Sequence, residues 1–168
     1  SNARESGNKY IPKGFLNIPF GMSLESAESL LKEKGFQFRT FNQWQIKIDG
    51  HFSFSGGDAT EAILSFNPDS GFYEGSAKLE GKDPTDTNSL YDRIHDLIQR
   101  KYRSFPKEKK RQVQKGKRYS FDEWLFSTPE GKFGIEIMLY NDVVHIKYNA
   151  SQFTPKFPRV SVDPDSFL

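Results

Sequence analysis

Three histidines are the residues of this chain best suited to acid–base chemistry near neutral pH, because imidazole titrates in that range. They are His51, His95 and His145, and they are widely separated in the sequence. His51 and His145 fall on the polar sides of predicted strands, where water reaches them. His95 lies on the polar side of a predicted helix, three residues after Asp92. A lone pair of this kind is typical of an exposed helix contact and not of a catalytic dyad.

The remaining reactive residues also lack the arrangements that catalysis or metal binding requires. The chain has 168 residues and no cysteine, which excludes disulfides, thiolate zinc sites and cysteine nucleophiles. No two histidines have metal-ligand spacing such as His-x-x-x-His. The adjacent Asp122 and Glu123 would point to opposite faces of a strand. We therefore expect no metal, no cofactor and no enzymatic activity.

One segment carries an unusual charge. Between Arg100 and Arg118 there are ten cations and one acid, Glu108. Removing them from the totals of 24 Lys+Arg and 22 Asp+Glu leaves 14 cations against 21 acids, so the chain is strongly polarised. A basic cluster of this kind is suited to a phosphate-rich or acidic partner. The candidate binding residues are Lys107, Lys109, Lys110, Arg111, Lys115, Lys117 and Arg118.

The same segment also fits a solvated loop whose charges keep a sheet edge soluble. Between Lys107 and Arg118, Val113 is the only apolar residue, and no aromatic residue is present to stack on bases. These features favour the solvated loop, and nucleic acid is not expected among the partners.

Two amphipathic helices must help to position these residues. The first begins at the N-cap Ser23 and ends before Gly35, which suits a left-handed C-terminal position. The second is predicted over 87–103, with Pro106 limiting its continuation. Its apolar face is predicted to consist of Leu90, Ile94, Leu97, Ile98 and Tyr102.

Alternating residues predict strands between and after the helices. A hairpin of 44–47 with 51–54 is expected to pair Ile46 with Phe52 and Trp44 with Phe54, and a second hairpin joins 62–66 to 72–79. The last three strands follow Tyr119, and a turn at Asn141-Asp142 places Leu139 opposite Val144 and Glu136 opposite Lys147.

The strand beginning at Tyr119 is apolar on both sides. Phe121 and Leu125 lie on one face, and Trp124 and Phe126 lie on the other. We expect both faces of this strand to be covered, one of them by the Pro-rich C-terminal tail.

These elements predict an α+β fold in the order helix, four strands, helix, three strands, with both helices packed on one face of antiparallel sheet and a loose internal duplication. Residues 1–3 are typical of a purification-tag remnant, and 4–153 are expected to form one domain with halves at about 13–82 and 83–153. Residues 154–168 form the Pro-rich tail. No apolar run approaches the length of a membrane helix.

The residues around the first helix also resemble a known group of proteins. Phe15-Leu16-x-Ile18-Pro19-Phe20-Gly21-Met22-Ser23-Leu24-Glu25-x-Ala27, followed by Leu30-Leu31 and Gly35-Phe36, is similar to the opening of small exported proteins and lipoproteins of Gram-negative bacteria. The order of elements resembles the tandem helix-plus-sheet modules of the β-lactamase-inhibitor-protein type and of the SmpA/OmlA family. The matching positions are helix caps and core residues, so the resemblance transfers a fold and no catalytic residue.

The resemblance implies a non-catalytic binding or scaffold module of the bacterial envelope, whose partner is another protein or an envelope component. It implies a periplasmic or outer-membrane-associated location, with a lipid anchor on the native precursor; a cytoplasmic location is the alternative. Two other functions stay open: a polyanion-binding module that uses 100–118 to hold nucleic acid or anionic lipid, and a proteinaceous enzyme inhibitor.

Overall fold

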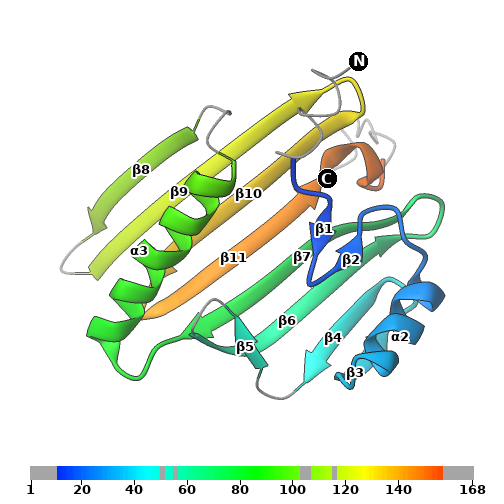
Figure 1. Ribbon diagram of the computed structural model, residues 1–168, viewed down its shortest axis with the longest axis horizontal. Helices are drawn as coiled ribbons and strands as arrows, with labels where there is room; N and C mark the ends of the chain where they lie inside the picture. The colour runs from blue at the N-terminus through cyan, green and yellow to red at the C-terminus, as the bar shows by residue number, and fades with distance from the viewer. Residues whose placement is uncertain (1–10, 50–51, 55–56, 103–106, 115–116, 157–168) are drawn as a thin grey trace, which may run out of the picture.

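A single nine-stranded antiparallel sheet forms the body of the molecule in the computed structural model (Figure 1), which describes residues 11–49, 52–54, 57–102, 107–114 and 117–156. Along the sheet the order is β3-β4-β6-β7-β11-β10-β9-β8, and β5 pairs with β6. The strands are β3 (Gln37–Phe41), β4 (Gln45–Asp49), β5 (Phe52–Phe54), β6 (Gly57–Asn67), β7 (Gly71–Glu80), β8 (Lys107–Gln114), β9 (Lys117–Thr128), β10 (Gly131–Tyr140) and β11 (Val143–Ala150).

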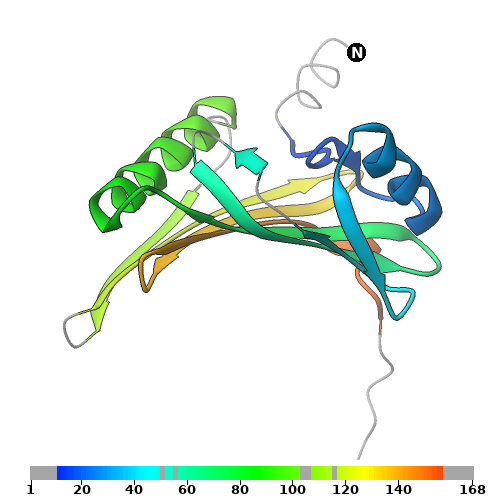
Figure 2. The same cartoon turned by 90° about the horizontal axis from the view of Figure 1, so that it is seen from below.

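Two helices and a small hairpin lie over the same face of this sheet, as Figure 2 shows. The helices are α2 (Leu24–Glu33) and α3 (Pro84–Lys101), and the hairpin consists of β1 (Gly14–Phe15) and β2 (Ile18–Pro19). The opposite face carries no helix from the described part of the chain, and in Figure 2 it lies on the inner side of an arch. A short 3-10 turn, η1 (Ser151–Phe153), follows β11. Neither helix combines the length and the apolar composition needed to span a bilayer, among the residues described.

The caps of both helices follow directly from the sequence. The Ser23 hydroxyl accepts a hydrogen bond from the amide of Ser26 at 3.2 Å, which confirms the predicted N-cap of α2. Gly35 adopts a φ of 80°, as expected for a glycine that ends a helix. The α3 helix begins three residues earlier than predicted, because Asp83 caps it and Pro84 occupies its first turn.

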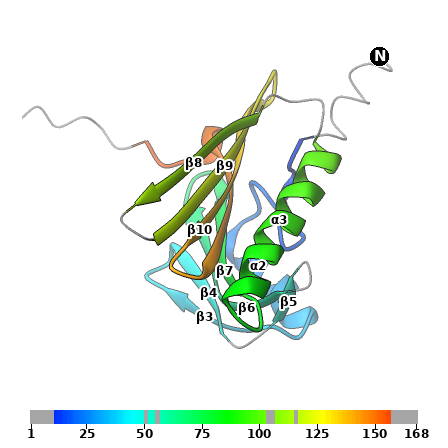
Figure 3. The ribbon, with the colours of Figure 1, turned by 90° about the vertical axis from the view of Figure 1, so that its left-hand side faces the viewer.

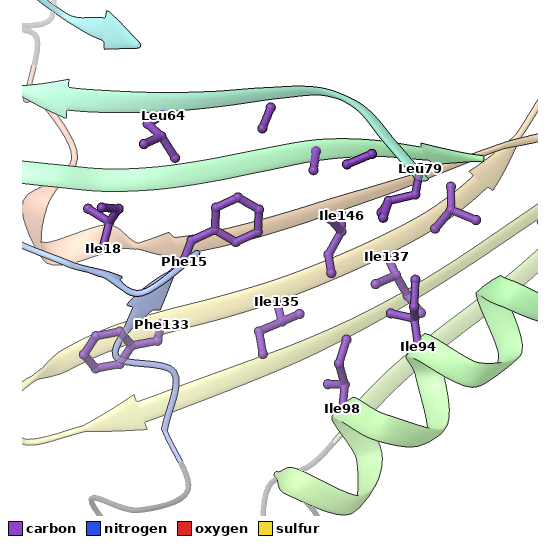
Figure 4. Packing of buried hydrophobic residues seen from close by; sticks show 14 of the residues in the cluster. Phe15, Ile18, Leu64, Leu79, Ile94, Ile98, Phe133, Ile135, Ile137 and Ile146 are labelled. Carbon is purple, nitrogen blue, oxygen red and sulfur yellow. The ribbon is translucent and has the colours of Figure 1, made fainter. Parts of the chain in front are cut away.

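The core lies between the sheet and the elements that cover it. Ile94 and Ile98 of α3 point towards Ile137 of β10, and Phe15 of the β1–β2 hairpin points towards the middle of the sheet (Figure 4). Gly75 on β7 lies directly beneath Phe15, where a Cβ atom would stand only 2.3 Å from the ring. The hairpin therefore packs on the sheet at a position that only glycine permits.

The predicted order of helix, four strands, helix and three strands is wrong, although a helix followed by an antiparallel meander does occur twice, as α2 with β3-β4-β6-β7 and as α3 with β8-β9-β10-β11. The β1–β2 hairpin precedes α2, five strands separate the helices, and four follow α3. The prediction lacked β3 and β8, the two strands at the outer edges of the sheet. Both are poor in apolar alternation, because an edge strand buries little side-chain surface.

The predicted hairpin of 44–47 with 51–54 is also wrong. Ile46 pairs with Thr40 on one side and with Leu64 on the other, while Phe52 pairs with Ala59. The β4 strand is thus an internal strand, and β3 joins it through a three-residue loop, Asn42 to Trp44, in which Asn42 and Gln43 have positive φ.

A second predicted hairpin and one predicted register are confirmed. The β6 and β7 strands form the predicted hairpin, with Asn67 paired to Gly71. In the β10–β11 hairpin Leu139 lies opposite Val144, and Glu136 lies opposite Lys147. The apolar pairs and the charged pairs indicate the same register, because apolar residues occupy one face of the pleated sheet and charged residues occupy the other.

Candidate partner-binding face

The helix-free side of the sheet, which we call the open face, is formed by the alternate residues of its strands. On β6, Ala62 and Leu64 are fully buried on the helix-covered side, whereas Ile63 between them is only half-buried. The register carries this alternation across the sheet, so Ile63 is paired with Ser76 and Ser76 with Lys147. The open face therefore runs over β6, β7, β11, β10 and β9.

A shallow groove of about 250 Å³ lies on the open face over these five strands. Its apolar side chains are Ile63, Phe121 and Met138, and Met138 pairs with Phe121 on one side and His145 on the other. Its polar side chains are Glu61, Ser76, Lys78, Glu136, His145 and Lys147. An apolar floor with convergent charged groups is the composition expected of a recognition surface.

The charged groups at the β6–β7 end of the groove form a paired cluster. Glu61 accepts from Lys78 at 3.0 Å and lies 3.4 Å from the ammonium of Lys47. The hydrogen bond from Lys78 lowers the pKa of Glu61, with a smaller contribution from Lys47, although partial burial opposes this. Glu61 therefore carries its negative charge at neutral pH.

His145 occupies the centre of the groove and favours its neutral form. Burial lowers its pKa, and the nearby charge of Lys78 lowers it further, while Glu61 acts in the opposite direction. Its strand neighbours on either side are Lys78 and Met138, which pair with it in the register. Ser76 also lines the groove. Within the described part of the chain, no hydrogen bond joins the Ser76 hydroxyl to the His145 ring.

Apolar residues extend the open face from the groove towards β9. Leu125 is 55% exposed, and Tyr140 is 42% exposed. The Tyr140 ring meets the Tyr119 ring edge-on, with centroids 6.4 Å apart. The prediction that both faces of the β9 strand are covered is therefore wrong for the described residues, because Trp124 and Phe126 are buried beneath α3 while Leu125 is exposed. Residues 157–168 of the predicted covering tail lie outside the described residues.

A second polar cluster lies between α3 and β9, on the covered side. The Tyr91 hydroxyl donates to Asp122 at 2.5 Å, and Asp122 is fully buried. His95 Nε2 stands 3.8 Å from the other oxygen of Asp122, and its ring packs against Trp124 with centroids 5.6 Å apart. The prediction of an exposed His95–Asp92 contact is thus wrong: the His95 side chain is 16% exposed and packs on the sheet.

This cluster brings imidazole, phenol and carboxylate together, but it does not form an open site. Asp122 is fully buried, the His95 side chain is only 16% exposed, and neither residue lines the groove of the open face. A substrate would need access to these groups, whereas α3 covers them. The cluster instead holds α3 against β9.

The basic candidate residues lie at one outer edge of the sheet, where Figure 3 shows β8 alongside β9. Lys107, Lys109, Lys110 and Arg111 belong to β8, so the predicted loop is wrong for these positions. Lys117 and Arg118 begin β9, and Lys115 lies outside the described residues. In the register, Lys109 is opposite Asp122, and Lys110 is opposite Phe121. The strand order therefore places β8 at an outer edge of the sheet.

No family model and no curated protein matches the chain. Among the described residues, no group of three or more His, Asp or Glu side chains is placed to hold a metal ion. The assignment of a function therefore depends on the geometry of the open face.

The sequence alone did not single out the open face. Its residues come from β6, β7, β9, β10 and β11, and only the strand order brings them together. One signal was present in the sequence: Phe121 and Leu125 lie on the side of their strand opposite Trp124 and Phe126. A strand with apolar residues on both sides, in a sheet with one covered face, marks a surface that favours a partner.

Proposed function

We propose that this chain is a non-catalytic binding module that holds a partner protein on the open face. The observation that carries the proposal is the groove at the centre of the helix-free side, where Ile63, Phe121 and Met138 are only partly covered. An antiparallel sheet with one solvated face ordinarily shows polar residues there. Here that face instead combines apolar and aromatic side chains with paired charges.

The dimensions of the open face suit a protein partner better than a small molecule. The groove is shallow and holds only about 250 Å³. From β6 to β9 the face is about 20 Å wide at the usual spacing of strands. Strands of about ten residues at about 3.3 Å per residue make the face about 33 Å long, so its area of roughly 650 Å² is close to the roughly 800 Å² that each partner buries in a standard interface.

The chemistry of the face favours a partner with an apolar residue flanked by polar groups. An inserted apolar side chain would contact Phe121 and Met138, while Glu136 and Lys147, whose charged atoms are 3.9 Å apart, lie beside them. Partly covered aromatic residues at the centre of an interface contribute most to affinity. The resemblance to small exported lipoproteins supports a place for this module in the bacterial envelope.

A charge placed in the groove tests this proposal. Met138→Lys would put an ammonium group among the apolar residues, and Leu97→Lys, at an exposed position on α3, is the matched control. A partner captured from an envelope extract and then purified is expected to bind Met138→Lys at least about tenfold more weakly than the wild type. It should bind Leu97→Lys unchanged. Equal affinity of all three proteins would overturn the proposal.

A second candidate function, polyanion binding, is favoured by the position of β8. Lys107, Lys109, Lys110 and Arg111 lie together on an outer edge strand, where a linear polyanion has access to the backbone edge. Retention on heparin should then fall steeply with salt, because phosphate or sulfate binding releases counterions. The triple variant Lys109→Glu, Lys110→Glu and Arg111→Glu should lose this retention. Unchanged retention would remove this candidate.

A further inference from the structure

Trp44 stands between two hollows at the end of the sheet, away from the open-face groove. One hollow, of about 790 Å³, lies between the start of α2 and the β3–β4 turn. The other, of about 650 Å³, lies against the residues around η1. Both are lined by Trp44 and by the β6–β7 turn from Phe66 to Ser70. We call these two hollows together the Trp44 site.

The backbone holds Trp44 in place while its ring stays open. Its amide donates to the carbonyl of Phe41 at 3.1 Å, and its carbonyl accepts from the amide of Phe66 at 2.7 Å. The tight turn at Asn42-Gln43, with φ values of 41° and 65°, fixes its direction of approach. Yet the side chain is 41% exposed. A large aromatic ring held in this way is a flat apolar platform that gains by being covered.

The walls of the Trp44 site are formed by side chains that already have partners. Asn67 Nδ2 donates to the carbonyl of Phe153 at 3.1 Å, and Asn67 Oδ1 accepts from the amide of Asp69 at 3.0 Å. The Ser70 hydroxyl donates to the same Phe153 carbonyl at 3.0 Å. The β6–β7 turn and η1 are thus joined, so the site exists before any ligand binds.

Other polar side chains of the site form no hydrogen bond within the described part of the chain. The side chains of Asn42 and Gln43 and the carboxylate of Asp69 make no hydrogen bond to other described residues. Gln152 also lies in the wall of the second hollow, but its Oε1 is buried. The amides of Asn42 and Gln43 and the carboxylate of Asp69 are available to hydroxyl groups of a ligand.

We propose that the Trp44 site binds a neutral oligosaccharide. A pyranose ring has an apolar face of C–H groups that packs on an indole, and hydroxyl groups around its edge that pair with amides and carboxylates. The charges do not favour an anion, because Glu25 and Asp69 line the hollows with Lys156 as the lone cation of their described lining. One sugar unit covers Trp44, and its neighbours extend into the two hollows.

Calorimetric titration of the full chain with three neutral probes, N-acetylchitohexaose, cellohexaose and maltohexaose, tests this inference. We expect at least one of them to bind. Trp44→Ala should weaken its binding at least about tenfold, whereas Trp44→Phe keeps a flat ring and most of the affinity. Leu97→Ala, which truncates an apolar residue of similar exposure on α3, should leave the affinity unchanged.

A second position makes the result independent of any effect of Trp44 on folding. Asp69→Ala removes a hydrogen-bonding group on the β6–β7 turn and should weaken binding by about fivefold. Thermal unfolding of each variant checks that the fold is kept. Failure of all three probes to bind, or full affinity in Trp44→Ala and Asp69→Ala, would overturn the inference. Because these variants leave the groove of the open face intact, either result is separate from the proposed partner binding.

Discussion

Buried Asp122 shows how a single residue fixes the covered side of the sheet. A carboxylate removed from water needs hydrogen-bonding partners, and Tyr91 supplies one from α3 at 2.5 Å. Trp124, two residues along β9, donates to Gln99 of the same helix at 3.1 Å. These two bonds attach α3 to β9 at defined positions, in addition to the less directional contacts of the apolar core.

Tyr91→Phe tests the strength of this attachment. The change removes the hydroxyl group while keeping the ring, and we expect it to lower the free energy of unfolding by about 1–3 kcal/mol. Tyr73→Phe, at a partly exposed position on β7, is the control and should stay within about 0.5 kcal/mol. Urea denaturation measures both. Equal stability of the wild type and Tyr91→Phe would show that the bond to Asp122 contributes nothing.

The lowered pKa of His145 predicts a pH dependence. Burial and the charge of Lys78 disfavour its protonated form in the folded protein, with Glu61 opposing them. The unfolded chain protonates His145 near its ordinary pKa of about 6.5. The unfolded state thus binds more protons below this pH, so His145 makes stability fall as pH drops from about 6.5 through the folded-state value.

Paired urea titrations at pH 7.5 and 5.5 isolate this effect. The wild type should lose more stability between the two pH values than His145→Asn, which cannot titrate. The other charged groups that face His145 from β6, β7, β10 and β11 stay in both proteins, and they are Glu61, Lys78, Glu136 and Lys147. An identical loss in both proteins would contradict the assignment.

At the scale of elements, the position of α3 on the sheet decides which residues are core. Ile94 is buried and Leu97 is 45% exposed, although both belonged to the predicted apolar face of this helix. The observed apolar contact surface is rotated towards Tyr91, which is buried with its hydroxyl bonded to Asp122. The hydrogen bond between Tyr91 and Asp122 thus helps to set the rotation of α3 about its own axis on the sheet.

Truncation of these two side chains measures the orientation of α3. Ile94→Ala should cost about 2–5 kcal/mol of stability, because it leaves a cavity in the core. Leu97→Ala should change the stability by less than about 0.5 kcal/mol. Denaturant unfolding gives both values. Similar losses for the two variants would mean that α3 packs as the sequence pattern first indicated.

The elements with a buried face were predictable from the sequence, and the edges were not. Caps at Ser23 and Gly35 and the β10–β11 register follow from local rules that the structure keeps. The β3 strand carries Arg39 and Thr40 and has little apolar alternation, so local patterning does not reveal it. Its pairing was not predicted either, because the sequence pattern favoured a hairpin of β4 with β5, whereas β4 lies between β3, which precedes it directly, and the more distant β6.

The candidate site was less predictable than the fold, for a related reason. Ile63 lies on β6, far in the sequence from Phe121 and Met138, which lie on the consecutive strands β9 and β10. Each looks like an ordinary alternate position in its own strand, and only the strand order makes them neighbours. The basic residues stood out in the sequence because charge is visible without a fold, but they occupy an edge.

At the scale of the whole molecule, one face of the sheet packs against supporting elements and the opposite face is available for binding. Both helices and the β1–β2 hairpin cover one face, and the opposite face stays open along the arch in Figure 2. A sheet supported in this way is a rigid platform, and rigidity lowers the entropy lost on binding. We propose that the partner protein binds to this open face of the sheet.

Site-specific photocrosslinking in cells that produce this protein tests that claim most directly. A benzophenone amino acid placed at Met138 on the open face and, in a separate protein, at Leu97 on α3 reports what touches each side. The account predicts one discrete crosslinked protein from position 138 that is absent from position 97. The same adduct from both positions, or none from position 138, would contradict it.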